Sequence, residues 1–211
     1  MPTITQLSLY QGALRLLAEQ KLSSISEARE ARYLLDDVWS DGVIDECLQL
    51  GQWKFATRTV MLDSSPSVSS DFGLQFAFEK PSDFIRTVAI SSDEFFNNPL
   101  ARYADENGHW WADQDPIYVK YVSNDEEFGT DYSLWPVNFK NMVEAYMASK
   151  IVTALTNGES KKDGIRKDLK LALDIALGTD AQAGPVVVAP RGYWAGARGG
   201  SYRRNGRGPD R

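Results

Sequence analysis

The chain has 211 residues, of which 43% are hydrophobic and 25% charged, as expected for a globular protein of one domain. No apolar run approaches the roughly 20 residues that cross a bilayer, which argues against a membrane partner. The N-terminus lacks the basic and apolar stretches of a signal peptide, so we expect the protein to stay in the cytoplasm. A net charge of −6 argues against general nucleic-acid binding, and a single cysteine excludes an internal disulfide.

Two helices are predicted in the first quarter of the chain. Apolar residues recur every three or four positions and predict a helix over residues 5–20. Ser24 precedes Glu27 by three positions, which is the spacing of a capping box, and it predicts the start of a long helix over residues 24–50. Gly42 weakens the middle of that helix, where a kink or break is expected.

The middle third changes to an alternating pattern and predicts a β insertion over residues 53–122. We expect a small antiparallel sheet of about five strands. The Asn107-Gly108 dipeptide predicts a tight hairpin turn with positive φ at both positions. The strands are expected at residues 53–62, 74–79, 85–91 and 117–121, and in the hairpin arms, residues 100–105 and 109–112.

Helical periodicity returns in residues 136–157 and 160–177, and Gly178 is the expected stop of the last helix. The predicted fold class is therefore α+β: a bundle of about four helices with an inserted small antiparallel β-sheet. Residues 1–178 form the predicted body. Residues 179–211 form a predicted extended C-terminal arm.

The arm differs from the body in composition. Its last 21 residues hold six Arg, six Gly and three aromatic residues against one acid, for a charge of +5, which leaves −11 on residues 1–190. A segment of this kind has no core of its own to join, so it is a free tail or an attachment to another molecule. One Arg-Gly-Gly triplet also permits an alternative reading, a nucleic-acid-binding protein that uses this tail.

No catalytic constellation stands out. His109, beside the hairpin turn, is interpreted as a turn-flanking or surface residue, and Cys47 as a buried core residue. Phosphate-loop and dinucleotide-binding motifs are absent from the sequence, and we expect no enzyme activity, cofactor or metal site. Acidic residues cluster in expected turns and are interpreted as solvated; a metal-dependent enzyme built on Asp113 or Asp115 is the rival reading. The clusters are Asp93-Glu94, Asp113 with Asp115, and Asp125-Glu126-Glu127.

Residues 31–62 carry a recognisable order of features: ARYLLDDVW, then IDECL, then GQWKFA. A strand followed by Lys80-Pro81-Ser82-Asp83-Phe84, and Trp135-Pro136 before a helix, continue the pattern. Over about residues 5–190 the chain resembles the tail tubular protein A family, the head-to-tail adaptors of short-tailed bacteriophages. The order of the features carries this resemblance, since no single motif in it is highly specific.

The resemblance implies a structural virion protein at the head–tail junction, assembled in the host cytoplasm. Family members form a ring of twelve between the portal protein and the tail nozzle, a tail tubular protein B-like partner, and genomic DNA passes through the central channel without specific binding. We expect the isolated chain to be monomeric or weakly associated, with the portal templating the ring.

The arm is the expected portal-binding element, because Arg, Tyr and Trp dominate binding hot spots and a short β-prone run can extend an open sheet edge. Trp110 and Trp111, beside the hairpin turn, are a candidate contact for a neighbouring subunit or the nozzle, with ordinary sheet packing as the alternative. The expected portal-binding residues are Val186, Val187, Val188, Arg191, Tyr193, Trp194, Arg198, Tyr202, Arg203 and Arg204.

Overall fold

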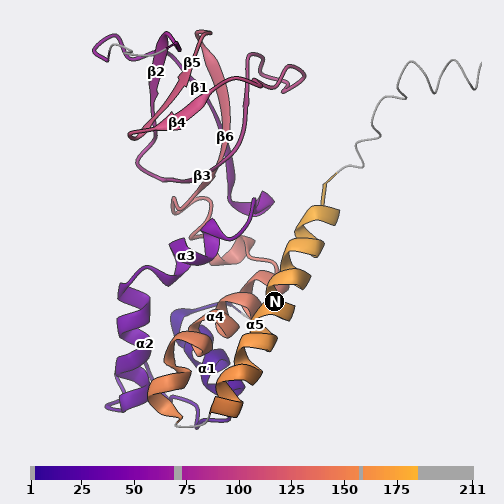
Figure 1. Cartoon of the computed structure of the whole chain (residues 1–211). Helices are drawn as coiled ribbons and strands as arrows, with labels where there is room; N and C mark the ends of the chain where they lie inside the picture. The colour runs from indigo at the N-terminus through magenta and orange to yellow at the C-terminus, as the bar shows by residue number, and fades with distance from the viewer. Residues whose placement is uncertain (1–2, 69–72, 157–158, 185–211) are drawn as a thin grey trace, which may run out of the picture.

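The computed structural model describes residues 3–68, 73–156 and 159–184, in which a helical body carries two small β-sheets at one end (Figure 1). In the sequence, helices come before and after the strands of the middle third, and this mixture confirms the α+β class. The helices are α1 Gln6–Leu16, α2 Glu30–Ser40, α3 Val43–Gln49, α4 Val137–Leu155 and α5 Glu159–Gln182, with short 3-10 turns η1 Lys54–Ala56 and η2 Tyr132–Leu134. The strands are β1 Thr57–Leu62, β2 Phe76–Glu79, β3 Phe84–Ser91, β4 Ala104–Glu106, β5 His109–Ala112 and β6 Ile117–Ser123. Within the described residues, no helix combines the length and apolar character that a membrane span requires.

The first helix, α1, is shorter than predicted. Thr5 caps its start in a capping box, in which the Thr5 hydroxyl accepts from the Ser8 backbone N–H at 3.2 Å and the Ser8 hydroxyl accepts from the Thr5 backbone N–H at 2.9 Å. Ala18 has a φ of +56°, a left-handed conformation that a helix cannot continue through. The helix therefore ends at Leu16, before the expected end at residue 20.

The predicted long helix over residues 24–50 is two helices, α2 and α3. Its predicted capping box is wrong: Glu27 instead accepts from the backbone N–H and hydroxyl of Ser23, and α2 begins only at Glu30. Gly42 has a φ of +84° and separates α2 from α3. The break expected at this glycine is confirmed, because glycine adopts this conformation without the cost that a Cβ imposes.

The strands form two three-stranded antiparallel sheets, in the orders β1-β6-β3 and β2-β5-β4, and not the single sheet predicted. Phe78 and Trp110 from the second sheet pack with Ile90, Val119 and Tyr121 from the first, so the sheets share one apolar core. The hairpin at Asn107-Gly108 is confirmed, with φ values of +50° and +75°.

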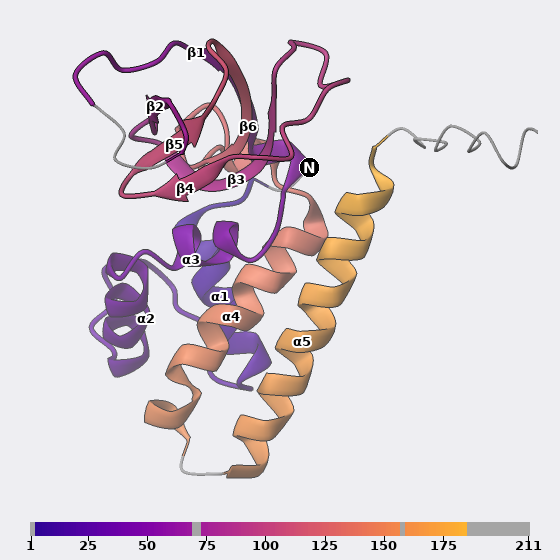
Figure 2. The same cartoon turned by 45° about the horizontal axis from the view of Figure 1, so that its top comes forward.

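The C-terminal helix, α5, runs antiparallel to α4 along one edge of the body and extends beyond its expected end (Figure 2). Gly178 lies inside it, where a Cβ would meet nothing within 4 Å, and the helix continues to Gln182. The predicted end of the last helix, at residue 177, is therefore five residues too early. A glycine in a helix interior costs about 1 kcal/mol relative to alanine, which packing of the helix can offset.

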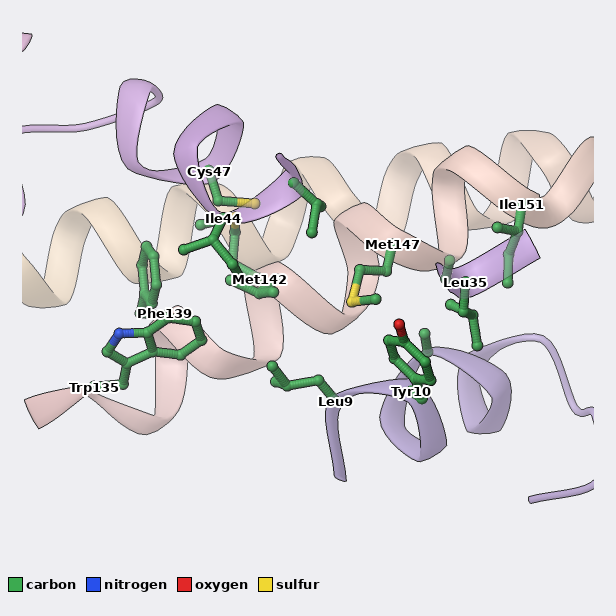
Figure 3. Close-up of a cluster of buried hydrophobic side chains, with 14 of the residues drawn as sticks. Leu9, Tyr10, Leu35, Ile44, Cys47, Trp135, Phe139, Met142, Met147 and Ile151 are labelled. Carbon is green, nitrogen blue, oxygen red and sulfur yellow. The ribbon is translucent and has the colours of Figure 1, made fainter. Parts of the chain in front are cut away.

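The largest core lies between the helices and reaches the first sheet. Figure 3 shows side chains from α1, α2, α3 and α4 meeting there. Val122 of β6 is part of this core, and Ile85 and Val88 of β3 pack against it. The first sheet therefore joins the helical core on one face to the β core on the other, which couples the two parts of the molecule.

Candidate interaction surfaces

The predicted portal-binding residues, Val186 to Arg204, lie outside the described residues, because the structure describes the chain only as far as Gly184. The structure does define the place at which this segment begins. The preceding helix, α5, ends beside η1 and the start of α4, near the junction of the helical body with the sheets (Figure 1).

Lys54 fixes the last turn of α5. Its backbone N–H donates to Asp180 Oδ1 at 3.0 Å, and its Nζ donates to the carbonyl oxygens of Asp180 at 2.5 Å and Ala181 at 3.0 Å. Asn138 Nδ2 donates to Thr179 Oγ1 at 2.8 Å. The last carbonyls of a helix lack partners within it, and a cation opposes the negative end of the helix dipole. The C-terminal segment therefore starts from a fixed point on the body.

A groove of about 930 Å³ opens where the N-terminal segment meets the start of α4. Trp135 lines it and is held in place by its indole Nε1, which donates to the Gly129 carbonyl at 2.8 Å. The lining combines apolar surface with carboxylates, which suits an apolar side chain next to a basic one. The lining residues are Thr3, Ile4, Ser8, Glu126, Thr130, Asp131, Tyr132, Ser133, Trp135, Val137 and Lys140.

Trp110 and Trp111 point to opposite faces of β5, and both are buried within the subunit. Trp110 is 0% exposed; its ring packs edge-on against Phe84 at 5.1 Å, and its Nε1 donates to Thr87 Oγ1 at 2.9 Å. Trp111 is 6% exposed and packs with Leu74 and neighbouring residues. This corrects the expected contact with a neighbouring subunit or the nozzle, because neither indole presents a surface to another chain. Sheet packing, the alternative, accounts for both.

The remaining candidates for chemistry are distributed over the body. The His109 Nδ1 contacts the Asn107 carbonyl at 2.8 Å across the hairpin turn. Cys47 is buried in the helical core, and burial raises the pKa of its thiol, which disfavours the reactive thiolate. The described residues contain no group of three or more His, Cys, Asp or Glu side chains that can hold a metal ion.

The acidic clusters of the sequence lie in loops, where they close turns. Asp93 accepts from the Ser91 hydroxyl at 2.8 Å and from the backbone N–H of Asn98 at 2.8 Å. Asp115 accepts from the backbone N–H and hydroxyl of Ser64. Asp113 forms a 3.6 Å ion pair with Arg102. These contacts give the carboxylates structural partners.

Asp83, which precedes β3, gathers more polar contacts than sequence reasoning expected. Its carboxylate accepts from Arg58 Nη1 at 2.9 Å, from Ser123 Oγ at 2.5 Å and from the Tyr121 hydroxyl at 3.1 Å. Burial acts to raise the pKa of this carboxyl, but hydrogen bonds from Ser123, Arg58 and Tyr121 outweigh it and hold the pKa below its ordinary value. Burial and the neighbouring Asp83 charge raise the pKa of Tyr121 to about 12, so this hydroxyl remains a donor at neutral pH.

The Asp83 network predicts part of the acid sensitivity of the fold. Because the folded pKa of Asp83 lies below the unfolded value of about 3.9, its stabilisation is complete above about pH 4 and is lost as pH falls through the folded pKa. Between pH 4 and pH 3, we expect the free energy of unfolding to fall less steeply in Asp83→Asn than in the unsubstituted protein. Urea unfolding at pH 7, 4 and 3 measures this, and equal slopes would assign the acid loss to other carboxyls.

Neither a scan against models of known protein families nor a search of curated proteins finds a match to the chain. A function for the protein therefore has to be inferred from its residues, from the order of its sequence features and from the surfaces of its folded body.

Proposed function

We propose that the protein is a structural component of a bacteriophage virion. In this proposal it is a head-to-tail adaptor that forms a ring of twelve between the portal and the tail nozzle, with a central channel for DNA. The supporting sequence pattern lies in α2, α3, η1 and the strands that follow. In the structure α3 and η1 contact the first sheet, whereas α2 packs within the helical body (Figure 2).

The observation that carries the proposal is the contrast between an anchored helix end and the segment after it. Lys54 holds the last turn of α5 at a fixed point, and a segment with a charge of +5 follows a body that is strongly acidic. A basic, aromatic segment held at one point suits attachment of the body to a larger particle. Its arginines fit acidic groups on a portal, and Tyr193, Trp194 and Tyr202 fit apolar pockets.

Ring geometry makes such an attachment strong without requiring a large contact in each subunit. Twelve arms bound to one portal act together, so the assembled joint holds far more tightly than a single contact. Under this proposal the acidic body does not attract the DNA phosphates electrostatically, so it does not hold the DNA as it passes through the channel.

The decisive experiment mixes the protein with the portal of the same phage and images the product by electron microscopy. We expect a twelve-fold ring at one end of the portal. Particles without added density would overturn the adaptor proposal. Gel shifts with DNA provide the contrast with a nucleic-acid-binding protein, since the adaptor should bind DNA weakly and lose that binding as salt increases.

A chain truncated after Gly184 tests the role of the arm. We expect it to remain folded, since the Lys54 contacts to Asp180 and Ala181 are retained, and to lose measurable affinity for immobilised portal. The control keeps the length of the arm but replaces Arg191, Arg198, Arg203 and Arg204 with glutamine, and it should bind portal weakly. Unchanged affinity of the truncated chain would show that the arm is not the anchor.

A further inference from the structure

The groove at the start of α4 is acidic as well as apolar, and we refer to it as the α4 groove. Glu126 and Asp131 contribute carboxylates to its lining, and neither forms an ion pair with another described residue. Among the described residues that line it, Lys140 alone is positively charged, and its Nζ pairs with Glu144 Oε1 at 3.1 Å. Arg15 pairs with the other oxygen of Glu144 at 3.0 Å. The cations on this side of the groove are therefore engaged, whereas the two carboxylates are available to a basic partner.

The chain around the α4 groove adds to its negative charge. Most of the lining comes from residues 126–140. The stretch 121–139 contains four acidic residues and neither lysine nor arginine. Arg58, which approaches the loop at the Phe128 ring, is paired with Asp83 at 2.9 Å. Charges of one sign along a groove attract a ligand of the opposite sign, so the α4 groove favours a cation.

The apolar part of the α4 groove is made by aromatic and aliphatic side chains. Tyr132 and Trp135 pack edge to face, with ring centroids 4.9 Å apart. Val137 is 69% exposed, and Ile4 is half-buried. An aromatic ring placed here would cover apolar surface that water now contacts, while its polar atom remains hydrated. The groove therefore fits a segment in which a basic side chain lies close to an aromatic one.

The C-terminal arm has this chemistry. Residues 191–194, which lie outside the described part of the chain, read Arg-Gly-Tyr-Trp. The last 21 residues carry a charge of +5, against −11 on residues 1–190. A guanidinium group binds carboxylates through several donors, and the rings of tyrosine and tryptophan combine apolar faces with a polar edge. The arm therefore complements the groove in both charge and apolar surface.

The arm also begins within reach of the α4 groove. A Cβ added at Gly184 would lie 2.7 Å from Lys54 Nζ, and Asn138 in the first turn of α4 bonds to Thr179 of α5 at 2.8 Å. The N-terminus, the start of α4 and the end of α5 lie at the end of the helical body that faces the sheets (Figure 2). The seven residues from Gly184 to Arg191 can span about 23 Å when extended. A helix with its side chains is about 10–12 Å wide, so the arm can pass around the start of α4.

We propose that residues 191–194 of the free protein dock in the α4 groove of their own subunit, so that the arm is stored on the body. Arg191 pairs with the carboxylates of Glu126 and Asp131, and the two rings that follow it cover Val137. The docking goes beyond the adaptor function and does not depend on it. Where both hold, a portal that binds these residues has to displace them from the groove.

The covalent connection decides in favour of the same subunit. Ion pairs between solvated groups contribute little and are screened by salt, so the contact is weak and reversible. A segment joined to its site by a short connection has an effective concentration in the millimolar range. The arm of another copy competes only at the concentration of the protein in solution. The free protein therefore remains monomeric when its arm is docked.

Engineered cysteines in the full chain test the docking. After mild oxidation, Val137→Cys combined with Tyr193→Cys should give a closed monomer, which a non-reducing gel and mass spectrometry detect. The control combines Tyr193→Cys with Leu171→Cys, because Leu171 is 59% exposed and lies outside the groove, about 16 Å along α5 from Gln182. The native Cys47 is buried. Circular dichroism establishes that each variant is folded.

The rates of closure decide the outcome. We expect the Val137 pair to close about tenfold faster than the Leu171 pair, because docking raises the local concentration of residue 193 beside the groove. Equal rates for the two pairs would overturn the docking. Disulfide-linked dimers in place of closed monomers would overturn its placement within one subunit.

Two adjacent glutamates provide a matched test of the ion pair. Glu126 lines the groove, whereas Glu127 is equally charged and exposed but lies outside the lining. In the Val137→Cys/Tyr193→Cys chain at physiological salt, Glu126→Lys should slow closure by at least about threefold. Glu127→Lys should slow it less, since the Debye length is about 8 Å. Equal slowing by both would indicate a general attraction of the arm to the acidic body and would overturn the groove as its site.

The docking and the adaptor function fail separately, because closure is measured without portal. Fast closure in a chain that never binds portal would support the docking and overturn the adaptor function. Equal closure rates for the two cysteine pairs in a chain that does bind portal would overturn the docking and leave the adaptor function intact.

Discussion

Replacement of Trp110 by alanine is expected to lower the free energy of unfolding by about 3–5 kcal/mol, the usual cost of removing a fully buried large aromatic side chain. Trp110 is 0% exposed and packs between the two sheets, against Phe84 and Tyr121. Its loss also leaves the Thr87 hydroxyl without the indole donor. Urea unfolding followed by far-ultraviolet circular dichroism measures the change.

Two variants make the Trp110 prediction specific. Trp110→Phe retains a ring beside Phe84 and should cost less than alanine. Tyr103→Ala removes an aromatic ring that is 42% exposed near the same sheet, and it should change stability by no more than about 0.5 kcal/mol. Equal losses in Trp110→Ala and Tyr103→Ala would contradict the assignment of Trp110 to the core. A double Trp110/Trp111 alanine variant therefore reports folding, not contact with another chain.

The parts of the fold that the sequence predicts well are those decided by neighbouring residues. Asn107-Gly108 specifies its own turn, and the break at Gly42 needs only the conformational freedom of glycine. The end of α5 is different. Gly178 is a reasonable stop for an isolated helix, but Lys54, 126 residues from Asp180 along the chain, stabilises four further residues. The position of a helix end therefore depended on a contact that local patterns do not contain.

The arrangement of the strands also depended on distant contacts. The partners of β6 are β1 and β3, while β2 pairs with β5, so each sheet joins strands that are separated in the chain. Alternation shows that a strand has two faces but not which partner it takes. Local alternation also does not show what Trp110 and Trp111 pack against. Adjacent residues on a strand point to opposite faces, and in the structure Trp110 and Trp111 belong to two different apolar clusters.

The candidate functional features also differ in whether the sequence alone reveals them. The basic arm is visible in composition alone, because six arginines within 21 residues need no structure to be noticed. The Asp83 network is not visible in composition or in local patterns, because its partners Arg58 and Ser123 lie 25 and 40 residues away.

Replacement of Gly12 by alanine is expected to destabilise the protein by about 2–4 kcal/mol, although alanine is the better helix former. Gly12 faces Glu144 of α4. The Glu144 side chain is 2% exposed and forms ion pairs with Arg15 at 3.0 Å and Lys140 at 3.1 Å. A Cβ at position 12 would collide with the Glu144 carboxyl group. The carboxylate must then move away from its cations while it stays buried, and loss of those partners outweighs the gain of about 1 kcal/mol in helix propensity.

The chain offers a matched control for Gly12 and a second test of the cause. Gly164 lies in α5, where an added methyl group would meet nothing within 4 Å, so Gly164→Ala should stabilise by about 0.5–1 kcal/mol. Gly12→Ala combined with Glu144→Ala removes the collision, and its cost should be smaller than the sum of the two single losses. Thermal unfolding of the four variants measures both effects. If the Gly12 and Glu144 losses simply add, the steric explanation fails, because independent sites add and colliding ones do not.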